Sequence, residues 1–203
     1  MARIKNPKLI IALTGSIGSG KTLIAQVFKH LGVPVYLSDV EAKKLYENKE
    51  MISQIEDLFG SGVITNGQID KKKLADLVFN DSFLLKKLNN CVHPLVKQDF
   101  EKWALQQSFP YVIMESAIIY ETGWERLFDK IICVSTPMDL VLQRVQMRDN
   151  QTKEQIMKRI ANQMSADEKI KRSGYVINND NIQLVIPQIR EIHSQLLNAA
   201  ANC

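Results

Sequence analysis

Cysteine is scarce in this chain, and long apolar runs are absent from it. The three cysteines, Cys91, Cys133 and Cys203, are odd in number and far apart. This argues against a disulfide framework or a cysteine zinc site and predicts free or buried thiols. No apolar run approaches the roughly 20 residues that a membrane span needs, and residues 1–8 show no cleavable signal pattern. We therefore expect a cytoplasmic protein without a membrane partner.

A strong excess of charge of either sign is also lacking. The 203 residues contain 26 lysines and arginines against 22 aspartates and glutamates, a formal net charge of +4. No basic stripe with interleaved aromatic residues occurs, so we expect no nucleic-acid partner and attribute the basic balance to anionic substrates. With 45% hydrophobic residues, the chain suits one α/β domain with insertions. We expect a monomer or a weak homo-oligomer.

The most specific feature that is present is a phosphate-binding loop. Residues 15–22 read Gly-Ser-Ile-Gly-Ser-Gly-Lys-Thr after the apolar run 9–13, which is the context that this motif requires. Glycines let backbone N–H groups approach a phosphate, the lysine adds a mobile cation, and the threonine hydroxyl can bind Mg²⁺. The sequence therefore predicts nucleoside triphosphate binding. The predicted ATP-binding residues of this segment are Gly15, Ser16, Ile17, Gly18, Ser19, Gly20, Lys21, Thr22 and Leu23.

The rest of the chain alternates strands with helices, which is typical of a parallel sheet covered on both faces. The predicted strands are 9–13, 33–37, 111–114, 130–134 and 175–177. We predict a P-loop NTPase three-layer α/β fold with a parallel sheet of about five strands. A C-terminal helix is expected over 182–200, with Leu184 on its apolar stripe and Pro187 in its first turn.

Two segments are longer than ordinary connections. Residues 40–109 read as several helices around Gly- and Asn-rich turns, and we interpret them as an inserted helical subdomain that binds the acceptor. Residues 144–172 are polar and are predicted to form a mobile helical lid. Both would belong to a single kinase-like domain over 1–203. Its core would comprise 1–39, 110–143 and 173–203.

Acidic residues follow two of the predicted strands. Ligands sit at the carboxyl ends of strands in an open α/β sheet, so we expect Asp39 to face the phosphates. It could act as a base, position the attacking hydroxyl, or hold Mg²⁺ through water; an N-cap for a helix starting at Val40 is the alternative. Glu115 could position the metal or water, or could be an ordinary strand-end acid in solvent.

A series of motifs extends from the loop to the last predicted strand. They comprise 12–22, 31–35, Ser38-Asp39, 67–70, Leu74, Val78-Phe79, Leu88-Asn89, 93–95, Gln143-Arg144, Arg148-Asp149, Gln163 and 175–179. Over nearly the whole chain, these residues resemble the dephospho-coenzyme A kinase family. The loop is shared with many kinases, whereas the His-Pro element and the Arg/Gln-bearing lid are more particular to this family.

The resemblance implies transfer of the γ-phosphoryl group of ATP to the ribose 3′-hydroxyl of dephospho-CoA. The products would be CoA and ADP, and the reaction the last step of coenzyme A synthesis. By matching position, Asp39 becomes the catalytic base, and Lys21 and Arg148 further catalytic residues. Arg144 and Arg148 would meet nucleotide phosphates when the lid closes. ATP and dephospho-CoA would be the substrates, and Mg²⁺ the cofactor, held by Thr22.

Acceptor binding is predicted for Asp39, His93 and Glu121. A histidine before Pro94 could be a general base, but an X-Pro junction is also a natural helix end. We favour a structural or acceptor-binding role for His93. Three departures from the family occur. Ser16 replaces a usual glycine, residues 117–121 read Ala-Ile-Ile-Tyr-Glu in place of Pro-Leu-Leu-Phe-Glu, and Asp70-Lys71 replaces Asp-Arg.

Other classes share the phosphate loop. Another small-molecule or nucleoside kinase would also share Asp39 and the lid. A GTPase-type switch would explain Asp-Leu-Phe-Gly at 57–60, but that segment follows a helix-like run, so we expect Gly60 to be a helix C-cap. Residues 48–51, Asn-Lys-Glu-Met, end in the wrong residue for guanine recognition. A nucleic-acid-dependent ATPase lacks a basic surface here.

Overall fold

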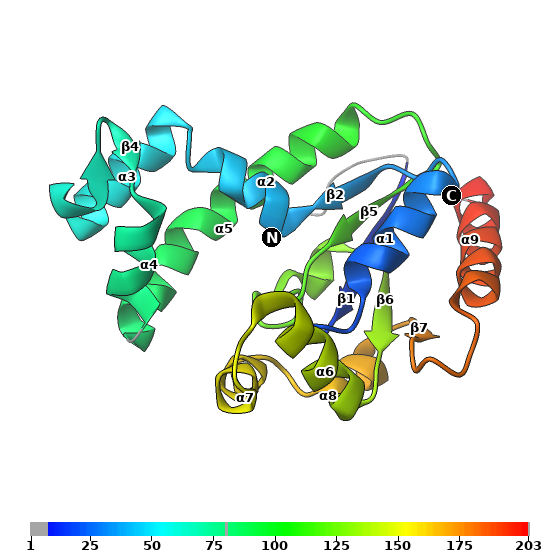
Figure 1. Ribbon diagram of the computed structural model, residues 1–203. Helices are drawn as coiled ribbons and strands as arrows, with labels where there is room; N and C mark the ends of the chain where they lie inside the picture. Colours follow the sequence, from blue (N-terminus) through cyan, green and yellow to red (C-terminus); the bar gives the residue numbers. More distant parts are fainter. Residues whose placement is uncertain (1–7, 80, 203) are drawn as a thin grey trace. The chain divides into compact units, whose positions relative to one another are not determined.

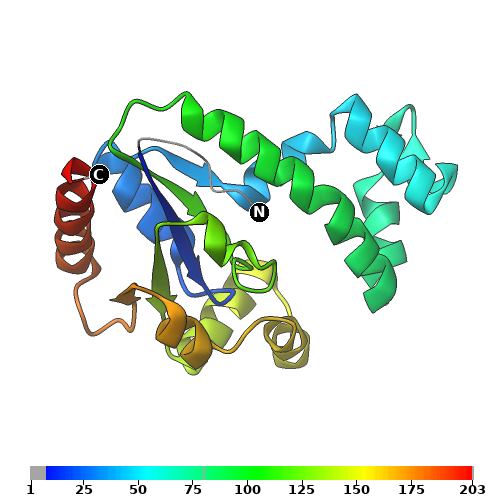
Figure 2. The same ribbon diagram turned by 180° about the vertical axis from the view of Figure 1, so that it is seen from behind.

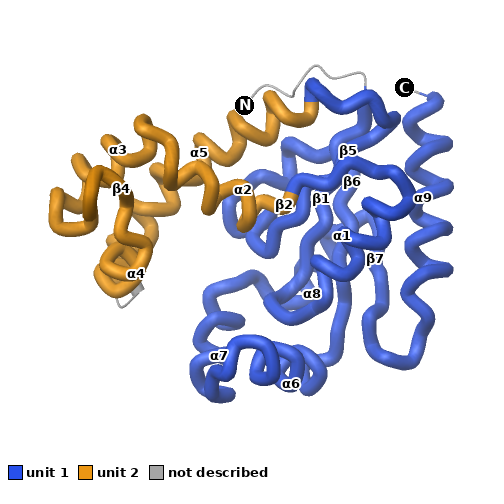
Figure 3. Tube along the Cα trace, turned by 45° about the horizontal axis from the view of Figure 1, so that its top comes forward, with its two compact units in different colours: residues 1–36, 105–203 blue, residues 37–104 orange. Residues whose placement is uncertain are grey.

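The computed structural model describes residues 8–79 and 81–202, which form two compact units (Figures 1 and 3). The first unit contains the described residues up to 36 and from 105 onward, and the second contains 37–104. The predicted insertion, 40–109, overlaps the second unit. Both boundaries fall inside regular elements, namely β2 (Val35–Leu37) and the last turn of α5 (Ser82–Leu105).

A five-stranded parallel sheet forms the centre of the first unit, as predicted. Its strands are β1 (Leu9–Gly15), β2, β5 (Tyr111–Glu115), β6 (Lys130–Ser135) and β7 (Tyr175–Asn178), in the order β2-β5-β1-β6-β7. Every residue of β1 is buried, because this strand pairs with β5 on one side and β6 on the other. The register pairs Leu13 with Glu115 and Gly15 with Val134. The carboxyl ends of three strands therefore meet beside the phosphate loop.

Helices flank this sheet. They are α1 (Lys21–His30), the short 3₁₀ helix η2 (Trp124–Leu127), α6 (Met138–Asp149), α7 (Lys153–Ala161), α8 (Ala166–Arg172) and α9 (Val185–Ala201). Helix α1 lies in front of the sheet in Figure 1 and contacts α9, whereas α8 lies in front in the opposite view of Figure 2 and contacts β1 and β6. The unit therefore has three layers.

The C-terminal helix differs from its prediction at its start. Pro187 lies in the first turn of α9, as expected, and Ile189 and Ile192 face the interior with Leu196. Leu184, however, is the N-cap residue and is 78% exposed, so its predicted place on the apolar stripe is wrong. Because α9 begins at Val185 and not at the predicted residue 182, Leu184 lies outside the helical periodicity that would bury it.

The polar segment 144–172 forms the end of α6 together with α7 and α8. Local capping explains these short helices. Thr152 and Gln155 form a reciprocal capping box at the start of α7, and Ser165 caps α8 by accepting a hydrogen bond from the backbone N–H of Glu168.

The second unit consists of helices and a short hairpin. Its elements are α2 (Ser38–Leu45), α3 (Lys49–Phe59), the 3₁₀ helix η1 (Ser61–Val63), β3 (Ile64–Thr65), β4 (Gln68–Ile69), α4 (Lys71–Phe79) and α5. Gly60, at φ 82°, ends α3, which confirms the predicted C-cap. The hairpin turns at Asn66 and Gly67, both with positive φ, as an Asn-Gly turn favours.

Helix α5 runs through Pro94, so a helix end at His93-Pro94 is wrong. An interior proline costs about 3 kcal/mol because it removes one hydrogen bond and crowds the preceding turn. The apolar stripe on both sides of it offsets that cost by burial. This stripe comprises Leu88, Val92, Val96, Phe100 and Ala104. No helix within 8–79 and 81–202 is both long enough and apolar enough to cross a membrane.

Candidate active site

The phosphate loop joins β1 to α1 at the carboxyl edge of the sheet (Figure 1). Gly18 adopts φ 73°, and a Cβ there would lie 2.5 Å from Cγ2 of Val145 on α6. Only glycine fits this position without strain. Helix α1 has no acidic residue in its first turn but carries Lys29 and His30 in its last. No side chain of the first turn therefore neutralises the partial positive charge at the N-terminus of α1, and this charge is available to a bound anion.

Lys21 is held over the first part of the loop. Its Nζ donates hydrogen bonds to the carbonyl oxygens of Gly15 and Ser16, each at 3.0 Å, and the residue is only 8% exposed. The ammonium group is thus fixed beside the amides that would surround a phosphate. Thr22 and Leu23 follow on the exposed side of α1. The predicted roles of these loop residues in ATP binding stay predictions.

Residues after β6 and β7 hold the second part of the loop. The carbonyl oxygen of Ser19 accepts hydrogen bonds from Asn179 Nδ2 at 2.8 Å and from Thr136 Oγ1 at 2.9 Å. Sequence reasoning missed Thr136 and assigned no role to Asn179 of the motif 175–179, although each follows a strand end, the same signal that drew attention to Asp39. Arg144 belongs to the same cluster, since its Nη2 donates to Asn179 O at 3.3 Å and to Asn181 Oδ1 at 2.7 Å.

Two polar atoms in this cluster are buried without a hydrogen-bond partner among the described residues. They are Nη1 of Arg144 and Oγ of Ser19. Arg144 Nη1 would lie 3.8 Å from a Cβ placed on Gly20, so the guanidinium group adjoins the loop itself. Buried polar atoms normally have partners. A phosphate-bearing ligand at the loop would supply acceptors for both.

Arg148 lies in a different environment from Arg144. Its Nε and Nη2 donate to the two carboxylate oxygens of Asp149 at 2.7 and 2.9 Å, and Arg159 Nη1 donates to the same carboxylate at 3.0 Å. These hydrogen bonds, chiefly those from Arg148, lower the pKa of Asp149 to about 2. The structure therefore does not bring the two predicted arginines into one cluster. Arg159 on α7 was not predicted, because its partner is ten residues away and leaves no motif.

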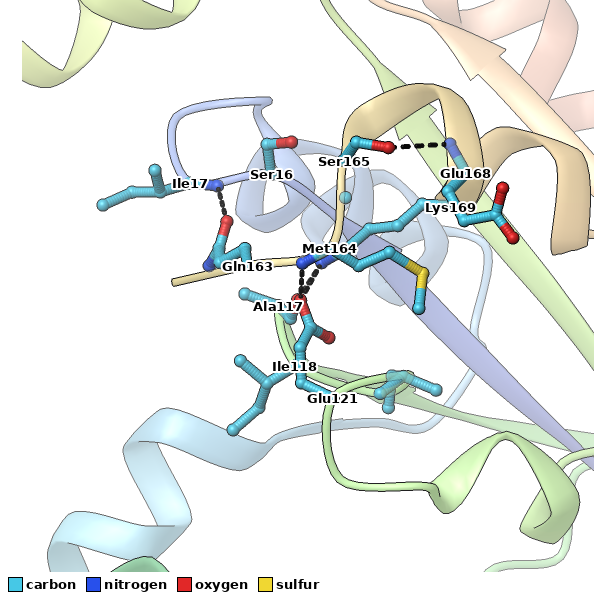
Figure 4. Close-up of polar contacts among 12 residues, drawn as sticks. Ser16, Ile17, Ala117, Ile118, Glu121, Gln163, Met164, Ser165, Glu168 and Lys169 are labelled. Carbon is cyan, nitrogen blue, oxygen red and sulfur yellow. Dashed lines mark hydrogen bonds and ion pairs between the residues drawn. The ribbon is translucent and has the colours of Figure 1, made fainter. Parts of the chain in front are cut away.

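The first part of the loop contacts the segment 144–172. The backbone N–H of Ile17 donates to Gln163 Oε1 at 3.1 Å (Figure 4). The side chain of Ile17 is buried in a cluster with Val145 and Ile156. Gln163 belongs to the motifs named above, but sequence reasoning assigned it no contact, since 146 residues separate it from Ile17.

A cavity of about 530 Å³ lies at the carboxyl ends of β1, β6 and β7. Its lining includes Ser16 of the loop, Ser135 and Asn178 at the strand ends, and residues of α6, α7 and α8. Clefts of this size, with a few polar groups among apolar ones, are typical of small-molecule sites. The cavity lies where the fold predicts nucleotide binding.

The predicted acids have distinct surroundings. Asp39 is exposed in the first turn of α2, which begins at Ser38 with Leu37 as N-cap, so the N-cap reading of Asp39 is wrong. Its orientation toward the phosphates stays a prediction. Glu115 is 7% exposed, which excludes the reading as a solvent acid. Strand β5 extends to Glu115, which pairs with Leu13 of the buried strand β1.

The two remaining candidates for acceptor binding are His93, which is partly buried, and Glu121, which is hydrogen-bonded and ion-paired within the first unit. His93 is half-buried on α5, and desolvation lowers its pKa below the ordinary value. Glu121 Oε1 accepts from the backbone N–H of Met164 at 2.8 Å and pairs with Lys169 Nζ at 2.8 Å. Neither observation tests acceptor binding. The two described thiols, of Cys91 and Cys133, are free, as predicted, and Cys203 lies outside the described residues.

The residues present fit a metal bound mainly by phosphates. Among the described residues, His, Cys, Asp and Glu side chains form no group of three that could hold a metal ion. Mg²⁺ keeps several waters and uses one or two protein oxygens plus substrate phosphates, so it needs no such cage. The exposed Thr22 at the start of α1 suits that role.

Similarity to known proteins covers nearly the whole chain. A family model described as dephospho-CoA kinase matches residues 9–184. A dephospho-CoA kinase of Bacteroides fragilis (strain YCH46) is 40% identical over 184 residues, covering 90% of each chain. The crystal structure of TT1252 from Thermus thermophilus has a TM-score of 0.81 and 31% identity, covering 95% of this chain and 97% of that one. A dephospho-CoA kinase from Campylobacter jejuni has a TM-score of 0.67 and 26% identity over 92% and 96% of the two chains.

Proposed function

Because the chain belongs to the dephospho-CoA kinase family, we propose that it transfers the γ-phosphoryl group of ATP to the ribose 3′-hydroxyl of dephospho-CoA. The products are CoA and ADP, and the reaction completes coenzyme A synthesis. Another small-molecule or nucleoside kinase is not favoured, since the family model and the named relatives agree on one activity. A cytoplasmic location, a monomeric or weakly oligomeric state and the lack of nucleic-acid partners stay predictions.

Positive groups surround the phosphate loop, and this observation supports the proposal on the side of the phosphate donor. Lys21, the N-terminus of α1 and Arg144 converge there, and Arg144 Nη1 is buried without a partner among the described residues. Phosphoryl transfer mainly requires positioning and charge neutralisation, because charge spreads over the phosphoryl oxygens in the transition state. These groups supply both.

The remaining catalytic roles follow from chemistry and the family. Asp39 accepts the proton of the ribose hydroxyl and orients that oxygen toward the γ-phosphorus. Arg148 exchanges its bidentate contact with Asp149 for the phosphates when ATP is bound. Thr22 would hold Mg²⁺ by its hydroxyl, and Asp39 or Glu115 would contact it through water. When bound, the metal neutralises charge on the phosphates.

Two further residues are proposed for acceptor recognition. We propose that His93 contributes from α5. Oε1 of Glu121 already accepts a hydrogen bond from the backbone N–H of Met164 and pairs with Lys169 Nζ. Its contribution to acceptor binding therefore lies in fixing the shape of residues 117–121.

A coupled ADP-release assay tests the reaction directly. With dephospho-CoA as acceptor, we expect turnover well above the rates with shikimate, gluconate or nucleosides, and a product phosphorylated at the 3′ position by ³¹P NMR. Asp39→Asn should bind ATP normally but lose most turnover. A better acceptor among the other compounds would overturn the substrate assignment, and near-normal turnover of Asp39→Asn would remove the proposed base.

A further inference from the structure

The connection between α7 and α8 joins the phosphate loop to the turn after β5. We call Glu121, Gln163, Met164 and Lys169 the brace. Figure 4 shows Gln163 reaching Ile17 of the loop on one side, while the next residue, Met164, faces Glu121 on the other. The brace therefore connects two segments that follow neighbouring strands, β1 and β5.

Gln163 and Lys21 together hold the two ends of one peptide unit of the loop. Its Oε1 accepts from the N–H of Ile17, and the carbonyl oxygen of that same peptide, belonging to Ser16, accepts from Lys21 Nζ at 3.0 Å. In a planar trans peptide the N–H and C=O point in opposite directions. Holding the N–H with Gln163 thus aims the C=O at Lys21, and hydrogen bonds in such a chain polarise one another.

An unusual buried charge holds Gln163 in place. Lys169 is 0% exposed, and its Nζ donates to Ala117 O at 2.6 Å and pairs with Glu121 Oε1 at 2.8 Å. An ammonium group out of water is costly unless it is paired and hydrogen-bonded, so both contacts are needed to keep it there. The same Glu121 oxygen accepts from the backbone N–H of Met164, at 2.8 Å. The backbone next to Gln163 is therefore fixed to the turn 117–121.

We propose that Gln163 is a positioning residue for Lys21, and that the Glu121–Lys169 ion pair holds Gln163 in register with the loop. The brace thereby couples the turn after β5 to the phosphate donor. This inference rests on the proposed function only for the identity of the acceptor. Gln163 acts through the peptide between Ser16 and Ile17 and touches no reacting atom.

Substitution of Gln163 separates positioning from a purely structural role. Gln163→Met keeps the length but removes the acceptor, so kcat should fall about tenfold, as the loss of one neutral hydrogen bond predicts. The KM for dephospho-CoA should stay within about twofold. Gln163→Glu still accepts from Ile17 and should keep kcat within about threefold, while its added charge raises the KM for ATP. Gln146→Met, on the exposed side of α6, is the matched control.

The outcomes of this experiment are distinct. A kcat of Gln163→Met within twofold of the wild type would overturn the positioning role. Equal losses of kcat in Gln163→Met and Gln163→Glu, or the same loss in Gln146→Met, would also overturn it, because the acceptor atom would then be irrelevant.

The ion pair is tested by removing both of its charges. Glu121→Leu with Lys169→Met removes the acceptor of the Met164 N–H together with both charges, and it avoids the unpaired buried ammonium that Glu121→Leu alone would leave. We expect this double variant to reproduce the kcat loss of Gln163→Met. Adding Gln163→Met to it should lower kcat by less than a further twofold, since the contact is already lost. A full tenfold further loss would show that the pair does not act through Gln163.

Nucleotide binding distinguishes failure of this inference from failure of the proposed function. Calorimetric titration with ATP and Mg²⁺ needs no acceptor, and we expect Gln163→Met to weaken the binding several-fold relative to Gln146→Met. That result combined with a wild type inactive on dephospho-CoA would overturn the proposed acceptor and support the brace. Wild-type turnover with unchanged ATP binding and unchanged kcat in Gln163→Met would overturn the brace alone.

Discussion

The two halves of the phosphate loop are held by different parts of the first unit. The first half, residues 16–18, is packed against α6 and hydrogen-bonded to Gln163. The second half, residues 19–21, is fixed to the sheet through Thr136 and Asn179. A rearrangement within 144–172 would therefore reach the first half through Val145 and Gln163, and the second half only through Arg144, because Thr136 and Asn179 lie outside that segment. The loop thus combines one half held mainly by residues at strand ends with another held by α6 and by Gln163.

Lys21 spans both halves, so its removal should have the largest effect. It belongs to the second half by position, but its Nζ contacts the carbonyl oxygens of Ser16 in the first half and of the preceding Gly15. We expect Lys21→Met to lower kcat by a factor on the order of 10²–10³, as loss of a preorganised group that stabilises transition-state charge does. Steady-state kinetics measures this. A reduction smaller than about tenfold would mean that the two halves are not joined through this side chain.

Gly18→Ala should break the first half through packing. The substitution combines a positive φ with a Cβ 2.5 Å from Val145, so we expect a loss of about 2–3 kcal/mol in the free energy of unfolding. Gly67→Ala is the matched control, because Gly67 has the same φ of 73° with nothing within 4 Å of the added Cβ. It should cost about 1 kcal/mol. Urea unfolding compares the two variants, and equal losses would argue against close packing on α6.

Asn179→Ala should weaken the second half more modestly. Ser19 O loses one of its two side-chain donors, while Thr136 still satisfies it. We expect ATP affinity to fall about fivefold, which corresponds to roughly 1 kcal/mol. Calorimetry with ATP measures the change, and Asn198→Ala on the exposed face of α9 serves as control. Unchanged affinity would show that sheet contacts do not stabilise the loop for phosphate.

Asp149→Asn should have the smallest effect, because it acts on an exposed pair. The substitution releases Arg148 from its carboxylate, and we expect the KM for ATP to fall about two- to fivefold. An unchanged or higher KM would mean that Asp149 does not compete with the phosphates.

Because the pKa of Asp149 is lowered to about 2 from 3.8, the pair stabilises the folded chain above pH 3.8 and loses this effect as pH falls through 2. An NMR titration of the carboxyl group checks the value.

Local patterns predicted the framework of the first unit. The five strands, the loop and the helix after it follow from apolar runs and a motif with a fixed context. Gly60 as a helix end followed from glycine chemistry. The helix end considered at His93-Pro94 was wrong because burial of apolar side chains along α5 outweighs the local cost of the proline.

Contacts between distant segments account for what the sequence did not reveal. Nothing near Gln163 indicates that it meets Ile17, and nothing near Lys169 marks it as buried beside Glu121. Arg148 illustrates a related difficulty. The arginines of the predicted lid are visible in the sequence, but the sequence does not reveal that Arg148 pairs with Asp149, because any polar helix can carry such a neighbour. A site role for residues after strand ends, such as Asn179, was predictable from the sequence, because ligands bind at the carboxyl ends of the strands in an open α/β sheet.

The two boundaries of the second unit have a consequence for protein engineering. β2 leads into α2 with no residue between them, and the other boundary lies inside the last turn of α5. A chimera that exchanges residues 37–104 would therefore cut a strand pairing and a helical turn, where inserted linkers are poorly tolerated. Transplanting the unit into another kinase of this fold requires junctions in the irregular stretches 31–34 and 106–110 instead. The strand would then travel with the graft, and both seams would fall where the backbone can accept foreign residues.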